Sequence, residues 1–317
     1  MIRYVVTGLL MLLGTASADL KIKGLAFGDY YYVASGADKE QNGFQIRRIY
    51  LTFDKKWNDR FTGRFRMEAN DAGFGAGAKM NPAVKDASLK YKNNGRSLVV
   101  GLSPTPTWSL TEEIWGYRSV EKTIMDLNGV GQSRDLGVLF ETPLDANGKV
   151  KAQFMFGNGN SNKSETNNDK KGYARLELSP RKSLGVLLYA DYETRPGDQD
   201  RTTFSAVAFS FGKDRAFAVE GVWQQRKSGG TGADVAVRGI SLFGRSKTKD
   251  DFGFFGRVDY FDPSDQASDD AITTVIGGVD IIPEANIHIM PNVIVEQFQN
   301  ASVETVVTPR ITLYYKF

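Results

Sequence analysis

Cysteine is absent from this chain of 317 residues, and histidine occurs once, as His288. Without thiols there is no disulfide framework, so an exported chain of this length must depend on a large core or on long hydrogen-bonded ladders. The lack of a Cys/His cluster predicts no metal site, and we expect no cofactor. A catalytic histidine would have to be His288, which has no serine motif near it, so we do not expect an enzyme.

Long apolar runs are also absent after residue 18, and so is a strong excess of charge of either sign. The chain has 40 Lys and Arg against 37 Asp and Glu, a balance that argues against a nucleic-acid-binding surface. A membrane protein without spanning helices must pair its backbone groups in a closed barrel. The 20 Phe and 13 Tyr fit strands that expose one face to lipid and one to water.

The N-terminus has the three parts of a secretory signal. Arg3 is the positive residue, residues 5–13 are apolar, and Ala16 and Ala18 form a small-residue cleavage site. A membrane anchor is the alternative, but the apolar run is shorter than the roughly 20 residues that a spanning helix needs. We therefore expect residues 1–18 to be a cleaved signal peptide and residues 19–317 to form a single domain.

The other end of the chain is a strand with one apolar face. In residues 307–317, the apolar side chains of Ile311, Leu313, Tyr315 and Phe317 alternate with polar ones. This ending resembles the C-terminal signature of bacterial outer-membrane β-barrels, which implies that Tyr315 and Phe317 form an assembly signal. An edge strand of a soluble β-sandwich is the alternative.

Alternating segments recur along the whole chain and predict an all-β fold, a transmembrane antiparallel β-barrel of about 16 strands. The expected strands start near Leu20, Gly43, Arg60, Ala83, Arg96, Arg134, Lys149, Lys171, Ser183, Arg201, Arg215, Asp234, Asp251, Ala271, Asn286 and Val303. Connections after even-numbered strands are short turns, whereas those after odd-numbered strands are long and polar, such as residues 158–169. We therefore expect both termini at the periplasmic rim and the last strand paired with the first.

The longest segment without strand character is residues 103–133, after the fifth strand. A helix is expected from Thr111 to Gly129, with Thr111 as its N-cap. Its apolar face would consist of Ile114, Tyr117, Val120, Ile124 and Leu127. Since an exposed apolar helix is unfavourable, we expect this loop to fold into the barrel and narrow it. An extracellular lid or a latch between protomers is the alternative.

Charged side chains on the predicted inner faces are candidates for lining a pore and setting its selectivity. An Arg or Lys costs about 2–4 kcal/mol on the lipid face at the bilayer midplane and little in water. Neighbours in a strand point in opposite directions, so Arg48 is expected inside and Arg47 near the rim. Facing charges would filter solutes, although each one could simply pair with a neighbour. The candidates are Arg47, Arg48, Arg64, Arg66, Glu68, Lys90, Glu112, Glu113, Arg118 and Arg175, and Arg238 is a further basic residue expected inside.

Four segments of the first half are similar to the phosphate-selective porin O and P group: QIRRIYLTF (45–53), FTGRFRME (61–68), DASLKY (86–91) and LVVGL (98–102). WGYRS (115–119) stands where such porins fold a loop into the pore. The resemblance implies a trimer of sixteen-stranded channels in which lumenal Arg ladders and Lys clusters give anion selectivity.

The expected function is a passive diffusion channel for small hydrophilic solutes or ions in the bacterial outer membrane. The alternatives are a substrate-specific, phosphate-like anion porin, a plugged structural or adhesion barrel, and an outer-membrane hydrolase. The expected partners are outer-membrane lipid, the outer-membrane assembly machinery, further copies of the chain in a homotrimer, and small polar solutes.

Overall fold

The computed structural model describes residues 20–70, 80–181, 183–230, 232–248 and 251–317. The predicted signal peptide, residues 1–18, lies outside these residues. The strands of the described part are β1 (Leu20–Tyr32), β2 (Asn42–Lys56), β3 (Phe61–Asn70), β4 (Ala83–Asn93), β5 (Arg96–Pro104), β6 (Arg134–Pro143), β7 (Val150–Gly157), β8 (Lys171–Arg181), β9 (Leu184–Glu193), β10 (Arg201–Phe211), β11 (Arg215–Arg226), β12 (Val235–Lys247), β13 (Phe252–Asp262), β14 (Ile272–Glu284), β15 (Ile287–Phe298) and β16 (Val306–Lys316).

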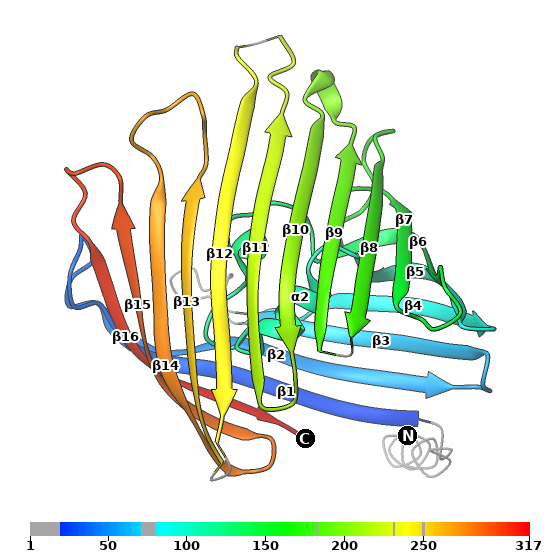
Figure 1. Cartoon of the computed structure of the whole chain (residues 1–317), viewed down its shortest axis with the longest axis horizontal. Helices are drawn as coiled ribbons and strands as arrows, with labels where there is room; N and C mark the ends of the chain where they lie inside the picture. The colour runs from blue at the N-terminus through cyan, green and yellow to red at the C-terminus, as the bar shows by residue number, and fades with distance from the viewer. Residues whose placement is uncertain (1–19, 71–79, 182, 231, 249–250) are drawn as a thin grey trace, which may run out of the picture.

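Each strand pairs with its neighbours in sequence, and β16 pairs with β1 to close the barrel (Figure 1). The closing register runs from Leu25 opposite Lys316 to Tyr31 opposite Arg310. Closure removes the free sheet edges, which an open sheet would expose. The predicted antiparallel barrel of 16 strands is confirmed.

The predicted strand starts agree with the observed ones within one residue, except for the last strand. We expected it to begin at Val303, but β16 begins at Val306. A turn replaces the first residues, because the Val303 N–H donates to the Asn300 carbonyl and the Ser302 N–H donates to the Asn300 side chain. Asn favours such turns, which the apolar pattern alone does not reveal.

The two faces of the barrel wall differ as the alternation predicts. On β16, Ile311 and Leu313 are 54% and 45% exposed, whereas Thr312 between them is fully buried. The apolar residues therefore face outward, and the hydroxyl faces inward. None of the helices in the described ranges is long and apolar enough to cross a membrane.

Two β-bulges interrupt the alternation on the early strands. Phe27 is opposite Arg48 and Gly28 is opposite Ile46, so Arg47 is the extra residue of β2. In the same way, Arg66 is opposite Asp86 and Met67 is opposite Val84, so Lys85 is the extra residue of β4. A bulge places two successive residues against one partner residue and redirects a side chain.

The inner loop, residues 105–133, connects β5 to β6 and lies within the ring of strands (Figure 1). The predicted inward fold is therefore confirmed, but the single helix from Thr111 to Gly129 is wrong. Two short helices are present, α2 (Ser109–Trp115) and α3 (Ile124–Leu127), and Thr111 lies inside α2 rather than capping it. Gly116 ends α2 in the left-handed conformation, with φ of 76°, which glycine adopts without steric penalty.

Candidate functional site: a constriction in the lumen

An aromatic cluster attaches the inner loop to one side of the barrel. Trp115 is fully buried and meets the rings of Phe243 on β12 and Phe255 on β13 edge to face, at 5.7 and 6.0 Å between centroids. Tyr117 stacks on Phe255 at 4.0 Å. Aromatic pairs of this geometry contribute about 0.5–1.5 kcal/mol each beyond the area that they bury. The loop is therefore a packed layer on β10 to β13.

Arginines from the wall bind the backbone that the broken helix leaves without partners. Arg245 of β12 donates to the Ile114 carbonyl at 3.1 Å, and Arg257 of β13 donates to the Lys122 carbonyl. From the opposite side, Arg47 of β2 donates to the Val120 carbonyl at 2.6 Å. These charged donors compensate for the hydrogen bonds that a continuous helix would have made.

The tip of the inner loop lies at the seam between the first and last strands. The Glu121 carboxylate lies 3.2 Å from Arg47 and 3.7 Å from Arg310 of β16. Burial favours the neutral acid, but Arg47, the Lys122 N–H and Arg310 outweigh it and hold the pKa of Glu121 below its usual value. The inner loop thus extends across the lumen, from the aromatic cluster on β12 and β13 to the seam between β1 and β16, and side-chain contacts hold it on both sides.

The wall opposite the loop carries a cluster of cations around Tyr50. The guanidinium groups of Arg48 and Arg66 and the ammonium group of Lys85 lie 5.6, 5.1 and 5.3 Å from the ring centroid. Arg48 also donates to the Tyr50 hydroxyl at 2.8 Å. An aromatic face stabilises nearby cations without neutralising them, so this wall keeps its positive charge.

Two carboxylates on the same wall are shared among these cations. Asp86 is fully buried and pairs with Arg66 at 3.4 Å and with Arg134 of β6. Glu68 pairs with Lys85 and lies 3.8 Å from Arg48. Each carboxylate has two basic partners, which leaves the basic wall, defined as Arg48, Arg66, Lys85 and Arg134, with more positive than negative charge.

The inner loop presents acidic groups toward the basic wall. Arg118 lies between two carboxylates, 3.0 Å from Glu112 and 3.1 Å from Asp126. Burial raises the pKa of Glu112, because Arg118 offsets the desolvation only in part and Asp126 adds repulsion. Asp126 interacts electrostatically with Arg48 across the gap, and Glu112 with Arg134. A passing solute therefore meets a transverse field.

The remaining candidate residues are distributed over the rest of the inner surface. Arg64 binds Asp54 at 2.7 Å, Lys90 binds Glu141 at 2.6 Å, and Arg175 donates to the Ser109 hydroxyl at 3.2 Å. Arg64 and Lys90 line a cavity of 540 Å³ together with Lys21, Lys23, Lys56, Asp54 and Glu141. Glu113 is exposed at the end of α2.

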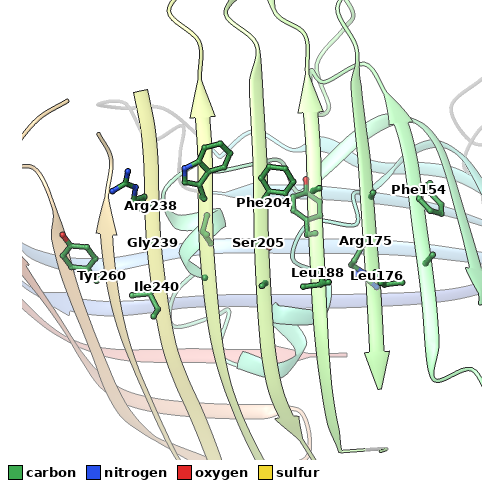
Figure 2. Close-up of a pocket in the computed structure, with 18 of the residues that line it drawn as sticks. Phe154, Arg175, Leu176, Leu188, Phe204, Ser205, Arg238, Gly239, Ile240 and Tyr260 are labelled. Atoms are coloured by element: carbon green, nitrogen blue, oxygen red, sulfur yellow. The ribbon is translucent and has the colours of Figure 1, made fainter. Parts of the chain in front are cut away.

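Two orientation predictions are wrong. Arg47 was expected near the rim, but the bulge turns it inward beside Arg48, where it binds the inner loop. Arg238 was expected inside, but Val237 beside it is fully buried in the barrel, which leaves Arg238 on the outer face. Arg238 borders an outer apolar groove of 960 Å³ with Phe204, Ile240 and Tyr260, on the side of the strands away from α2 (Figure 2). That groove faces the bilayer and is separate from the lumen.

The single histidine, His288, makes hydrogen-bonding and packing contacts. Its Nδ1 lies 2.9 Å from Asp280, which also accepts a hydrogen bond from Tyr117 at 3.2 Å. The ring packs edge to face against Tyr314. These contacts connect His288 to Tyr117 of the inner loop through Asp280 and give the ring a packing role.

Sequence reasoning missed Lys85 and Asp126 as members of the constriction. Lys85 and Asp86 are two charged neighbours within a strand, as are Arg47 and Arg48. In both places a bulge brings both side chains to the inner surface. Successive charges inside an otherwise alternating strand are therefore the signal that could have identified Lys85. Asp126 was hidden because the continuous helix that we expected does not form.

Comparison with known proteins agrees with this architecture. A family model described as phosphate-selective porin O and P matches residues 21–209. The structure is similar to the anion-selective porin from Comamonas acidovorans, with a TM-score of 0.69 and 13% identity over 94% of this chain and 99% of that chain. The trimer form of OmpT from Vibrio cholerae gives a TM-score of 0.67 with 13% identity over 94% and 99% of the two chains. OmpF from Salmonella typhi in complex with daunomycin gives a TM-score of 0.69 with 12% identity over 94% and 97%. No curated protein sequence matches the chain.

Proposed function

Because this chain belongs to the phosphate-selective porin O and P family, we propose that it is an outer-membrane porin whose constriction favours anions. It is a passive diffusion channel and not an enzyme. The selectivity proposal depends on one observation, the excess of cations on the basic wall. Glu68 and Asp86 each have two basic partners, and the carboxylates across the gap share Arg118.

Liposome swelling tests the preference with two solutes of equal size. A sugar acid and the corresponding amino sugar differ in the sign of their charge but little in diameter. We expect the sugar acid to enter faster at low ionic strength, where the charges are least screened. Equal rates for the two solutes would contradict charge selection at this constriction.

A second candidate function is a channel specific for phosphate-like oxyanions. The cavity of 540 Å³ favours it, because its charged lining has two acidic residues, Asp54 and Glu141, and more basic ones, namely Lys21, Lys23, Lys55, Lys56, Arg64 and Lys90. Such a site would bind phosphate and interrupt the current of a smaller anion. Titration of phosphate into a chloride current distinguishes the two functions, since saturable block at low concentration supports the specific channel and its absence supports the general one.

We further propose that three copies of the chain associate through the outer surface of β1, β2, β15 and β16. An apolar groove of 1270 Å³ crosses these strands, and small residues, Ala26 and Gly28, are part of its lining. Phe44 at its edge is 89% exposed, which is unusual for so large an apolar side chain. The structurally similar OmpT is described in a trimer form.

The terminal aromatic residues are proposed to act as the assembly signal. Phe317 is 78% exposed, and its backbone exchanges hydrogen bonds of 2.8 and 3.0 Å with Gly24 of β1. An assembly machinery that recognises the C-terminus would bind it where β1 and β16 close the barrel. Substitution of Phe317 with Ala should lower the amount of barrel in the outer membrane without changing refolding in detergent. An equal loss of folded barrel in the outer membrane and in detergent would mean that Phe317 contributes only to the stability of the barrel.

A further inference from the structure

A carboxyl group without a protein partner lies beneath the inner loop. Glu220 is on the inner face of β11, which is covered by α2, and its side chain is 1% exposed. Within the described part of the chain, no side-chain or backbone group donates a hydrogen bond to either of its carboxyl oxygens. Such a group needs an explanation, since an isolated charge is among the least favourable things to bury.

Among the residues that the structure describes, no cation near Glu220 is free to pair with it. Ser241 and Asp259 are its neighbours in the same row on β12 and β13. Asp259 accepts hydrogen bonds from Arg257 at 2.8 and 2.9 Å and from Ser241 at 2.6 Å. The one nearby guanidinium is therefore already committed to another carboxylate. On β10, the neighbouring inner residues are Ser205 and Val207, which carry no charge.

The two glutamates of α2 do not change the charge around Glu220. Glu112 pairs with Arg118 on the lumen side, and Glu113 is exposed. If Glu220 were ionised, two carboxylates would share Arg257 in a buried site, which is strongly unfavourable. A neutral acid avoids that cost and needs only a local hydroxyl or carbonyl group as its partner.

We propose that Glu220 is a buried proton-binding site that keeps the inner loop docked while it is protonated. Arg257 connects the site to the loop, because it donates to the Lys122 carbonyl and lies 5.4 Å from the centre of the Trp115 ring. Loss of the proton would place a second negative charge beside Arg257 and draw it away from these contacts. The loop would then move on its wall, and the width of the channel would fluctuate. This regulation rests on the proposed role of the inner loop as the constriction.

Single-channel recording across a pH series tests the proposal with Glu220→Gln, which mimics the neutral acid. The wild-type channel should conduct steadily at neutral pH and fluctuate between levels as the solution becomes alkaline. The Gln variant should lose the alkaline transition completely. Glu304→Gln removes the same group from an exposed loop and should keep it. A Gln variant with the wild-type pH profile would overturn the proposal.

Infrared difference spectroscopy of the reconstituted barrel separates protonation from conduction. The C=O stretch of a protonated carboxylic acid should be present at neutral pH in the wild type and absent in Glu220→Gln. Its absence from the wild type would overturn the proton site whether or not the constriction is where we propose. If the Gln variant does not fold, Glu220→Met supplies a neutral side chain of similar length. Failure of both neutral variants to fold would also contradict a site that holds a neutral group.

Discussion

Single charged residues define the constriction, and their direction is what the sequence predicts least well. The strand alternation correctly predicts which side Arg64, Arg66 and Glu68 occupy, because each lies in a regular run. The alternation is wrong for Arg47, because a one-residue bulge reverses the inward or outward direction of every side chain on one side of the bulge. The inward assignment of Arg238 is also wrong, because it came from the rarity of lipid-facing arginine and not from the alternation.

Arg66 offers a test of selectivity at this scale. Arg66→Gln removes one positive charge from the basic wall and leaves Asp86 with Arg134. A unit charge about 10 Å from an ion in water contributes about 0.4 kcal/mol, with opposite sign for an anion and a cation, so the anion-to-cation permeability ratio should fall by about fourfold. The ratio is measured from bi-ionic potentials. Arg96→Gln, at the exposed first residue of β5, carries the same change and should have no effect.

The inner loop is the element that lies across the lumen of the barrel. Its apolar spacing correctly predicts that Ile114, Tyr117, Val120 and Ile124 are buried. The break at Gly116 could not be predicted, since it depends on Arg245 and Arg47, which come from strands distant in sequence and bind the freed carbonyls. Local propensity favours a helix, and tertiary contacts override it.

Arg47 should be the most sensitive attachment of this element. Arg47→Ala removes the donor to Val120 and one partner of Glu121. Hydrogen bonds to charged groups contribute about 1.5–3 kcal/mol each, so the tip of the loop should detach in a measurable fraction of molecules. We expect larger and noisier single-channel currents with unchanged thermal stability of the barrel. Arg60→Ala, at an exposed turn, is the control, and quiet currents in Arg47→Ala would contradict this attachment.

Acidification should weaken the attachment of the tip of the inner loop, because it protonates Glu121. The pKa of Glu121 is lower in the folded protein than in the unfolded chain, so its contribution is complete above the unfolded value and is lost as the pH falls through the folded one. Limited proteolysis within the inner loop should therefore increase as the pH falls below the usual range of a glutamate carboxyl group. Glu121→Gln should be cleaved equally at neutral and acidic pH. A variant that still shows the acid transition would assign it to another group.

At the scale of the whole molecule, the sequence predicts the architecture better than any other feature. Turn length, strand alternation and the terminal strand each depend on local chemistry, and together they predict the closed ring of 16 strands. Association between copies depends on shape, which the alternation does not contain. The groove over β1, β2, β15 and β16 appears only when Ala26 and Gly28 lie beside bulky neighbours on a curved surface.

Phe44 tests which outer surface the copies share. Phe44→Ala should lower the temperature at which trimers dissociate, because a large exposed side chain is lost from the proposed interface. Phe254→Ala on β13 removes a ring that is 53% exposed on another part of the outer wall. Native gels of heated samples should show earlier dissociation for Phe44→Ala only. Equal effects of the two changes would exclude this surface as the specific interface.

The central claim is that this porin is an open channel whose basic wall favours anions. The reversal potential of single channels in a planar bilayer across a potassium chloride gradient tests it most directly. Discrete conductance steps with the dilute side negative are the expected result, because chloride would cross faster than potassium. A dilute side that becomes positive, or an absence of conductance steps, would contradict the claim.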